Sequence, residues 1–280
     1  MNENKRVGYL GPEGTFSHEA VLKVVDENTN IVPYPNILNI FESLANDEID
    51  EAVVPIENST EGSVVITLDA LTFFNLKIKA ELELPIKHNL LVQKGKTIDD
   101  IQVICSHQQA IAQCRNYIHN LKKPVHTMPS TANAARYVTE LSTAAVIGNK
   151  ILAKKYDLEI LEYNIQDYSN NVTRFIIIGK DDQKELSGND KTSILLSLKG
   201  DKPGGLYEIL GIFVNENINL TKIESRPSKQ GMGKYIFFID IEGHQKEPSI
   251  KKALTIIESK VAMFKILGSY KTITVEGELK

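Results

Sequence analysis

The sequence predicts an α/β protein whose first part forms two lobes, followed by a separate α+β domain. Short β-type runs alternate with helical patterns through about the first 180 residues, which is typical of α/β units on a mainly parallel sheet. Beyond a polar stretch at 181–191 the order changes to strand, helix, strand, strand, helix, strand. The chain has 280 residues, and single cores stop growing at about 250 to 300, so more than one domain is expected.

The chain is expected to cross between the two lobes twice. The first lobe takes about 1–78 and 166–180, and the second about 79–165. An alternating run at 78–93 predicts a long strand crossing to the second lobe, and 158–165 a return crossing, so the paired crossings make a cleft. Expected elements of the first lobe are strands at 6–11, 31–34, 51–58 and 173–180 and helices at 16–25, 37–47 and about 62–74; those of the second are strands at 103–106, 125–128 and 143–148 and helices at 108–121 and 131–141.

The C-terminal part, residues 192–280, is expected to fold by itself. The stretch 181–191 is polar and lacks periodicity, which is typical of a linker. The strand and helix order that follows is βαββαβ, the ferredoxin-like plan, which is complete in itself. A Gly-Pro turn within DKPGG separates its first strand from its first helix.

Composition narrows the class of function. Charged residues make up 24% and hydrophobic residues 42%, and the net charge of -4 argues against a nucleic-acid partner, which would favour a basic face. The start lacks the apolar run of a signal peptide, and the chain lacks a membrane span, so a cytoplasmic protein is expected. Cys105 and Cys114 have no zinc-like spacing and are interpreted as buried small residues rather than a bridge, metal ligands or a nucleophile beside His107.

Four polar junctions follow expected strand ends and precede helices, at 11–20, 55–64, 105–110 and 128–135. Helix N-termini present free N–H groups and about half a positive charge, so an acidic protein could bind a small anion there. The residues of each junction could also serve only as ordinary helix N-caps. Their convergence with Asn58, Asn170 and Asn171 favours binding, and the glycines match no nucleotide fingerprint. The hydroxyl side chains that could cap or bind are Thr15, Ser17, Ser59, Thr60, Ser106 and Ser130.

The segment SNNVTRFIII (169–178) places an arginine in a run of β-branched residues. Arg174 would be costly in an apolar core unless paired, so it should face a carboxylate of the ligand or of the protein, Glu57 being one choice. Thr173 points to the other face in regular strand geometry, although a bulge could bring both to the rim of the cleft. Residue physics alone therefore predicts a two-lobed binder of a small carboxylate and no particular reaction.

Several motifs resemble those of prephenate dehydratases, in the same order. They are GPEGTFS (11–17), VPIENSTEGSV (54–64), STANAA (130–135) and NNVTRF (170–175), and ESRP (224–227) resembles the ACT regulatory domain fused to those enzymes. The resemblance implies a two-lobed fold like that of periplasmic binding proteins with an ACT domain behind it. It also implies conversion of prephenate to phenylpyruvate, carbon dioxide and water without metal or organic cofactor.

The resemblance assigns roles to residues of the cleft. Thr173 matches the catalytic threonine and would hydrogen-bond or protonate the leaving hydroxyl, and Arg174 with the helix-end donors would hold the carboxylates. Glu57 would orient Arg174 or Asn58, and Phe175 would be cleft wall or core. The implied catalytic set is Thr173, Arg174, Asn58, Ser59 and Glu57, and the implied substrate-binding set is Thr15, Phe16, Ser17, Ser106, His107, Gln109, Ser130, Thr131, Asn171 and Phe175.

The resemblance also implies L-phenylalanine as a feedback effector, and a homodimer or homotetramer because such domains bind amino acids between two copies. The effector residues would be Gly204, Gly205, Leu206 and Tyr207 with Glu224, Ser225, Arg226 and Pro227. Here GGLY replaces the usual GALV, and SHQQAI replaces SHPQAL, with Gln108 in place of proline. Because the chain starts at the first dehydratase strand, a monofunctional protein is expected.

Two other functions compete with this one. Arogenate dehydratase would run the same reaction on a substrate with an ammonium in place of the keto oxygen, and no residue of the sequence decides between the two substrates. A small-molecule sensor without catalysis could use the same fold, although the Thr173 and Arg174 pair argues against it.

Overall fold

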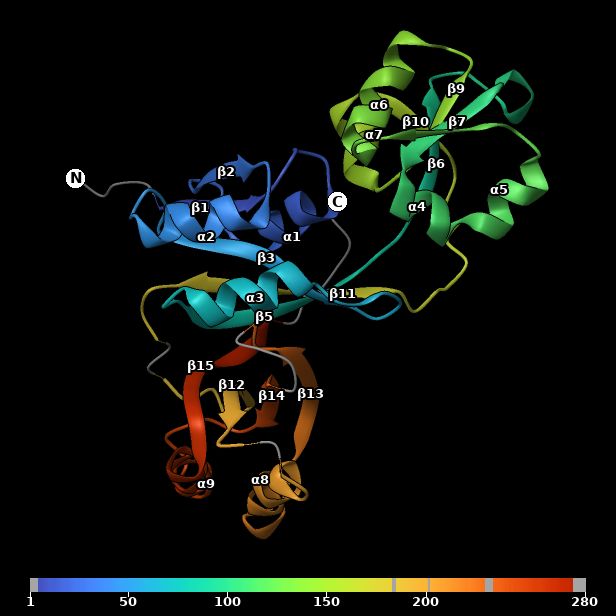
Figure 1. Ribbon diagram of the computed structural model, residues 1–280. Helices are drawn as coiled ribbons and strands as arrows, with labels where there is room; N and C mark the ends of the chain where they lie inside the picture. The colour runs from blue at the N-terminus through green and yellow to red at the C-terminus, as the bar shows by residue number, and fades with distance from the viewer. Residues whose placement is uncertain (1–4, 183–184, 201, 230–233, 274–280) are drawn as a thin grey trace. The chain divides into compact units, whose positions relative to one another are not determined.

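The structure is a computed structural model, and it describes residues 5–182, 185–200, 202–229 and 234–273 (Figure 1). The described residues form two compact units. The first unit contains the residues up to Thr67 and Glu83–Phe175, and the second contains Leu68–Leu82 and the residues from Ile176 onward. Helix α3 and strands β5 and β11 run from one unit into the other, so the chain connects the units three times.

The first lobe of the first unit is a parallel arrangement of β1, β2 and β3, with the start of β11 beside β3. Buried residues of β1 and β3, among them Val7 and Val53, form its centre, and β2 is the edge strand, which tolerates Pro33. Its elements are β1 (Arg6–Leu10), α1 (Phe16–Val24), β2 (Asn30–Tyr34), α2 (Ile37–Ala45), β3 (Glu51–Asn58) and β4 (Gly62–Ser63). Three more elements, α3 (Val65–Phe73), β5 (Lys77–Pro85) and β11 (Val172–Gly179), belong partly to the first unit and partly to the second.

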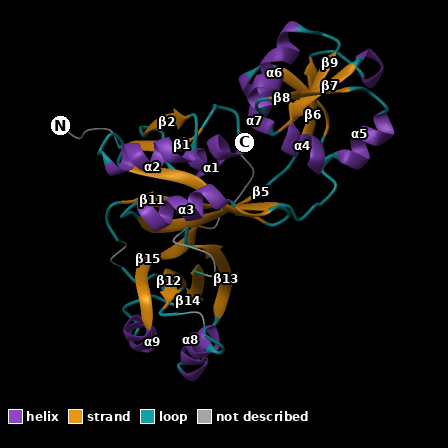
Figure 2. Cartoon of the chain, in the orientation of Figure 1, coloured by secondary structure: helices purple, strands orange, loops and turns teal. Residues whose placement is uncertain are grey.

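The second lobe is a five-stranded sheet in the order β10-β6-β9-β7-β8, with helices on both faces (Figure 2). Side chains alternate between two cores, since Cys105 packs with the residues of α6 on one face and Ile104 packs beside α4 on the other. The elements are β6 (Asn89–Gln93), a 3₁₀ turn (Ile98–Asp100), β7 (Val103–His107), α4 (Gln108–Gln113), α5 (Arg115–Leu121), β8 (Val125–Met128), α6 (Thr131–Glu140), β9 (Ala144–Gly148), α7 (Lys150–Lys155) and β10 (Leu158–Glu162).

The second unit contains the expected βαββαβ arrangement. Its sheet has the antiparallel order β13-β14-β12-β15, and β5 joins β15 in parallel. A core of Ile, Leu and Phe side chains fills the space between this sheet and helices α8 and α9. Strand β13 is at the free edge of the sheet. The elements are β12 (Asp190–Leu198), α8 (Gly205–Asn215), β13 (Leu220–Pro227), β14 (Tyr235–Glu242), α9 (Pro248–Lys260) and β15 (Val261–Ile273).

The fold class agrees with the sequence prediction, and several local features differ from it. The expected strand at 78–93 is two strands, β5 and β6, interrupted at 86–88. The expected helix at 108–121 is two helices, because Cys114 leaves helical geometry and the Asp167 carboxylate accepts hydrogen bonds from the first N–H groups of α5. The second-lobe sheet is mixed rather than mainly parallel, since β6 runs antiparallel to both β9 and β10.

The two cysteines lie on opposite faces of the second-lobe sheet. Both thiols are free and fully buried, as the sequence predicted. Burial raises the pKa of Cys114 to about 12, so this thiol stays protonated at neutral pH.

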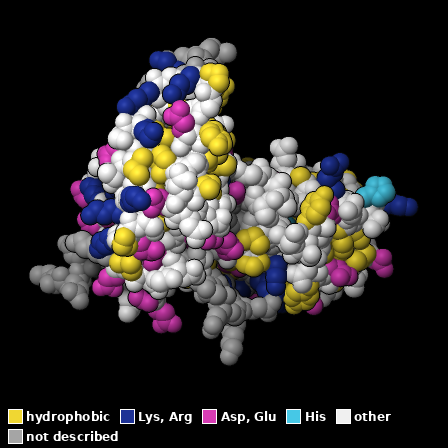
Figure 3. Space-filling model, turned by 90° about the horizontal axis from the view of Figure 1, so that it is seen from below, with side chains coloured by type: hydrophobic (Ala, Val, Ile, Leu, Met, Phe, Trp, Pro, Cys, Tyr) yellow, Lys and Arg dark blue, Asp and Glu magenta, His cyan; other side chains and the backbone are white. Residues whose placement is uncertain are grey.

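The surface carries charges of both signs. Figure 3 shows acidic and basic side chains interspersed over one face, with small apolar groups between them. Among the described residues, no helix combines the length and apolarity needed to cross a membrane.

Candidate active site

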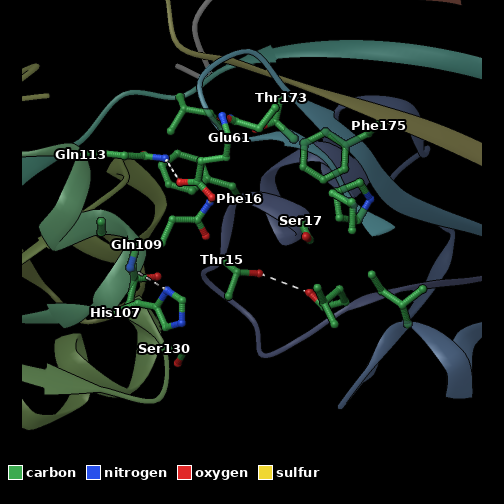
Figure 4. A pocket seen from close by; sticks show the side chains of 18 of the residues that line it. Thr15, Phe16, Ser17, Glu61, His107, Gln109, Gln113, Ser130, Thr173 and Phe175 are labelled. Atoms are coloured by element: carbon green, nitrogen blue, oxygen red, sulfur yellow. Dashed lines mark hydrogen bonds between the residues drawn. The ribbon is translucent and has the colours of Figure 1, made fainter. Parts of the chain in front are cut away.

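A cavity of about 520 Å³ lies in the first unit, with residues of both lobes in its wall (Figure 4). Most of the predicted cleft residues meet there. The predicted residues in the wall are Thr15, Phe16, Ser17, Asn58, His107, Gln109, Ser130, Thr131, Thr173 and Phe175, and the wall also contains Leu10, Gly11, Ile37, Pro55, Glu61, Gly62, Ser63, Val64, Ile86, His88, Ala110, Gln113 and Pro129.

Helix starts from both lobes border this cavity. Thr15 caps α1 by accepting from the His18 N–H at 3.3 Å, and Ser130 caps α6 by accepting from the Asn133 N–H at 3.0 Å. Thr15 and Ser130 therefore each cap a helix and also line the cavity. Each helix start adds positive potential toward the cavity. The described wall residues include no Lys or Arg, and the helix starts offer N–H groups that suit an anion.

The loop before α1 depends on a glycine. Gly14 has a φ of +93°, which favours glycine over residues with a Cβ. A Cβ at this position would stand 2.5 Å from Leu152 Cδ2 in the second lobe. The Gly14 N–H donates to His18 Nδ1 at 3.1 Å, so the loop is also fixed from inside α1. Gly14 thus allows both the turn into α1 and the close approach of α7.

Thr173 and Asn58 form the centre of the hydrogen-bond network at the cavity wall. Asn58 Nδ2 donates to Thr173 Oγ1 at 2.8 Å and to Asn171 Oδ1 at 2.8 Å. Asn58 Oδ1 accepts from Thr60 Oγ1 at 2.7 Å and from the Glu61 N–H at 3.1 Å, so its amide orientation is fixed. Because an amide NH₂ only donates, Thr173 Oγ1 is the acceptor in this pair, and its own proton is available to another group.

Five predicted site residues lie outside the cavity wall. Ser59 joins two strands instead, since its Oγ accepts from the Val172 N–H at 2.9 Å. Ser106 is fully buried and donates to the Ile147 carbonyl at 2.6 Å, so its hydroxyl has a structural role. Asn171 is 2% exposed and orients Asn58. The remaining two are Glu57 and Arg174.

Arg174 and Glu57 form an ion pair instead of binding in the cavity. The Arg174 Nε to Glu57 Oε2 distance is 3.6 Å. Thr173 and Phe175 both line the cavity, so strand alternation directs Arg174 to the other face of β11. The expectation that this guanidinium holds a cleft carboxylate is therefore replaced by the alternative of a salt bridge to Glu57.

The sequence interpretation missed the pairing of Glu61 across the cavity. Both Glu61 oxygens accept from second-lobe amides, from Gln109 Nε2 at 2.7 Å and from Gln113 Nε2 at 2.8 Å. Figure 4 shows the Glu61 and Gln113 side chains next to each other, joined by this hydrogen bond. Gln113 Oε1 also lies 2.8 Å from His88 Nε2. The i, i+4 spacing of the two glutamines was the only signal in the sequence, and it does not identify a remote partner.

Burial lowers the pKa of two histidines of this region. Burial lowers the pKa of His88, while its hydrogen bond to Gln113 acts in the opposite direction. Burial also lowers the pKa of His18. His107 caps α4, with Nδ1 accepting from the Gln109 N–H at 3.3 Å. Its neighbour Cys105 is buried in the core, which supports the structural interpretation of this pair.

The predicted effector residues lie in the second unit at two places. Gly204 to Tyr207 form the start of α8, where Gly204 has a φ of +82° and Tyr207 is 79% exposed. Glu224 to Pro227 form the end of edge strand β13. Arg226 Nη2 lies 3.7 Å from the carboxylate of Asp69 in α3, and Lys229 Nζ binds the same carboxylate at 2.6 Å.

Comparisons with known proteins cover both units. Residues 7–183 match the family model described as prephenate dehydratase, and residues 192–258 match the ACT domain model. A prephenate dehydratase of Methanocaldococcus jannaschii is 45% identical over 95% of this chain and 98% of its own length. A bifunctional chorismate mutase/prephenate dehydratase of Aquifex aeolicus is 40% identical over 96% of this chain and 74% of its own.

A solved structure shares the same architecture. It is a prephenate dehydratase from Arthrobacter aurescens in complex with L-Phe, with a TM-score of 0.86 and 36% identity. The match covers 95% of this chain and 90% of the other.

Proposed function

Since the chain belongs to the prephenate dehydratase family and carries an ACT domain, we propose that it converts prephenate to phenylpyruvate, carbon dioxide and water in the cavity described above. It is then a hydro-lyase. The observation that carries the residue assignment is the Asn58 to Thr173 hydrogen bond of 2.8 Å. That bond leaves the Thr173 proton for the substrate.

The reaction requires one bond to carbon to break at each end of the ring. As the bond between the ring and its carboxylate breaks, the electron pair enters the ring and carbon dioxide leaves. The bond to the ring hydroxyl breaks with its electrons on oxygen, and this oxygen needs a proton to leave as water. Thr173 donates a hydrogen bond to that oxygen, and the proton comes ultimately from solvent.

Thr173 acts mainly by position. A threonine hydroxyl is too weak an acid for its pKa to match neutral pH, so fixed geometry and an oriented dipole are its main contributions. Asn58 holds the hydroxyl, and Asn171 in turn holds the Asn58 amide. The donor is thus oriented before substrate arrives.

The substrate carboxylates are held by helix starts rather than by cationic side chains. Thr15, Phe16 and Ser17 begin α1, and Ser130 and Thr131 begin α6, all in the cavity wall. Free N–H groups at such positions stabilise anions. Because the ring carboxylate must lose its charge when carbon dioxide leaves, dipoles suit it better than a tight ion pair would.

Arg174 and Glu57 act as a positioning pair in this proposal. Their ion pair joins β11 to β3 on the strand face turned away from Thr173. Fixing the two strands keeps Asn58 opposite Thr173. Ser59 supports the same register, because its backbone N–H and hydroxyl both bond Val172.

An assay with purified protein tests the proposal. Incubation with prephenate should yield phenylpyruvate, whereas a small-molecule sensor would bind without turnover. A parallel incubation with arogenate decides between the two dehydratase substrates. Binding of prephenate without product would reject the catalytic proposal.

Regulation by L-phenylalanine is proposed for the second unit. The Arthrobacter aurescens relative was solved with L-Phe, and this chain carries GGLY and ESRP at the start of α8 and in β13. The free edge of β13 and the exposed Tyr207 and Val214 of α8 favour pairing of two copies, which gives a homodimer or a homotetramer. A cytoplasmic location also remains a prediction.

Added L-phenylalanine tests this regulation, since a ligand shifts a protein between states only through differential affinity. Activity should fall across millimolar L-phenylalanine, and the mass in solution should be a multiple of the chain mass. Unchanged activity, or a monomer at assay concentration, would reject the corresponding half of the proposal.

A further inference from the structure

Glu61, Gln113 and His88 form a chain of hydrogen bonds that the proposed reaction does not use. Glu61 lies in the β3–β4 turn of the first lobe, Gln113 ends α4 in the second lobe, and His88 lies between β5 and β6. All three line the cavity. The two links measure 2.8 Å each, from Gln113 Nε2 to Glu61 Oε1 and from Gln113 Oε1 to His88 Nε2.

The donors and acceptors fix the direction of this chain. An ionised carboxylate only accepts, so the NH₂ group of Gln113 must face Glu61. The Gln113 oxygen then faces His88 and must accept, which places the imidazole hydrogen on Nε2. His88 is 2% exposed, and its Nδ1 has no hydrogen-bond partner among the described residues. Gln113 is therefore the group that selects the tautomer of His88.

The ring of His88 in turn supports a wall of the cavity. It meets the Phe16 ring edge to face, with centroids 5.1 Å apart and planes at 90°. This aromatic geometry depends on the orientation of both rings. Phe16 is the first residue of α1 and lines the cavity, where it would contact the ring of the substrate.

We propose that Glu61 is a positioning residue which, through Gln113, sets the tautomer and ring orientation of His88 and thereby fixes the Phe16 wall of the cavity. The inference rests on the proposed function for its effect on turnover. The tautomer itself is independent of substrate.

The variant Glu61→Gln tests the relay with little change of shape. One amide oxygen cannot replace two carboxylate oxygens for Gln109 and Gln113, so the Gln113 amide is free to turn its NH₂ toward His88. We expect His88 to change from the Nε2–H to the Nδ1–H tautomer, as read from its ¹⁵N shifts. We also expect kcat/KM for prephenate to fall about fivefold to tenfold.

The double variant Glu61→Gln with Gln113→Glu exchanges the two groups. The carboxylate now at position 113 accepts from His88 Nε2–H and from the amide at position 61, so the original tautomer should return. Gln109→Leu is the matched control, because it removes one contact of Glu61 and leaves the link to Gln113. Glu13→Gln removes a separate contact between the lobes, to Lys155, and should leave the His88 tautomer unchanged.

The outcomes separate the relay from the proposed reaction. The relay is overturned if the parent protein has His88 as Nδ1–H or as imidazolium, or if Glu61→Gln keeps Nε2–H. It is also overturned if the exchanged pair does not restore Nε2–H, or if the tautomer changes while kcat/KM stays within twofold of the parent. A parent protein that does not turn over prephenate rejects the proposed function, while the tautomer series still decides the relay.

Discussion

Thr173 and Arg174 are adjacent in the chain and equally buried, at 9% exposure each, yet they face different surroundings. Thr173 lines the cavity and accepts from Asn58, whereas Arg174 pairs with Glu57 on the other face of β11. The same alternation separates Asn58 from Glu57 in β3. One pair of strands therefore carries a neutral hydroxyl and amide in the cavity wall and an ion pair outside that wall.

This difference has an electrostatic consequence. A guanidinium against the departing carboxylate would stabilise its charge, and that charge must disappear as carbon dioxide forms. A hydroxyl donor directed at the leaving oxygen stabilises charge that develops, which is the arrangement that speeds a reaction. The comparison predicts large kinetic effects on the Thr173 face and mainly stability effects on the Arg174 face.

Thr173→Val should produce the largest loss. The valine has the same shape without a donor, so kcat should fall by about 10² to 10⁴-fold, the range for loss of a positioned proton donor. Steady-state kinetics with prephenate measures this, and unfolding curves should match the parent. Thr173→Ser is the control because it keeps the hydroxyl. A valine variant with near-parent turnover would remove Thr173 from the mechanism.

Asn58→Asp should have the next largest effect, through hydrogen-bond direction alone. A carboxylate only accepts, so Thr173 would turn its proton to position 58 and away from the substrate. We expect kcat to fall by about 10² to 10³-fold, the cost of losing one oriented donor. Comparison with Asn58→Asp in the Thr173→Val background measures the coupling. Additive losses would show that the two residues act separately.

Most of the fold can be predicted from residue patterns in the sequence. The face of β11 on which Arg174 lies could also have been predicted from them. The βαββαβ order and the four polar junctions depend on local periodicity and strand ends, which a sequence displays. Strand alternation places Thr173 and Phe175 together and Arg174 opposite them. The sequence interpretation gave weight to a charge that could bind a carboxylate and left Glu57 as an alternative.

Other features depend on partners that are distant in the chain. No Gly or Pro marks the break at Cys114, which is stabilised when Asp167 caps α5. The partners of Glu61 are two glutamines of the other lobe, about 50 residues further along the chain. Sequence periodicity reports local structure and not contacts between distant residues, so only the three-dimensional structure reveals these pairings.

Glu57→Gln should have a smaller effect, and on stability more than on catalysis. It leaves Arg174 with a neutral partner, but Glu57 is 36% exposed, so water replaces part of the lost interaction. We expect the free energy of unfolding to fall by about 1 kcal/mol and kcat to change less than threefold. Denaturant titration and kinetics of the same preparation measure both. A loss of turnover as large as that of Thr173→Val would show that the ion pair takes part in catalysis.

The smallest expected effect concerns pH and a contact between the lobes. Burial raises the pKa of Glu19 above its ordinary value of 4.5, and Asn149 Nδ2 donates to this carboxyl at 3.1 Å. The folded state then binds the proton more tightly than the unfolded state does. The stabilisation is complete below the unfolded pKa and is lost as pH rises through the folded pKa. Glu19→Gln should therefore gain stability over the parent as pH rises above about 4.5.

Glu13 supplies a control of opposite sign on the same loop. Its hydrogen bond and ion pair with Lys155 lower its pKa, so its contribution is present above the unfolded pKa and is lost as pH falls. Glu13→Gln should consequently lose stability relative to the parent at neutral pH and approach the parent in acid. The free energies of unfolding of the parent, Glu19→Gln and Glu13→Gln, measured from about pH 4 to 8, test both signs. Parallel pH profiles for both variants would show that burial of Glu19 does not determine its protonation.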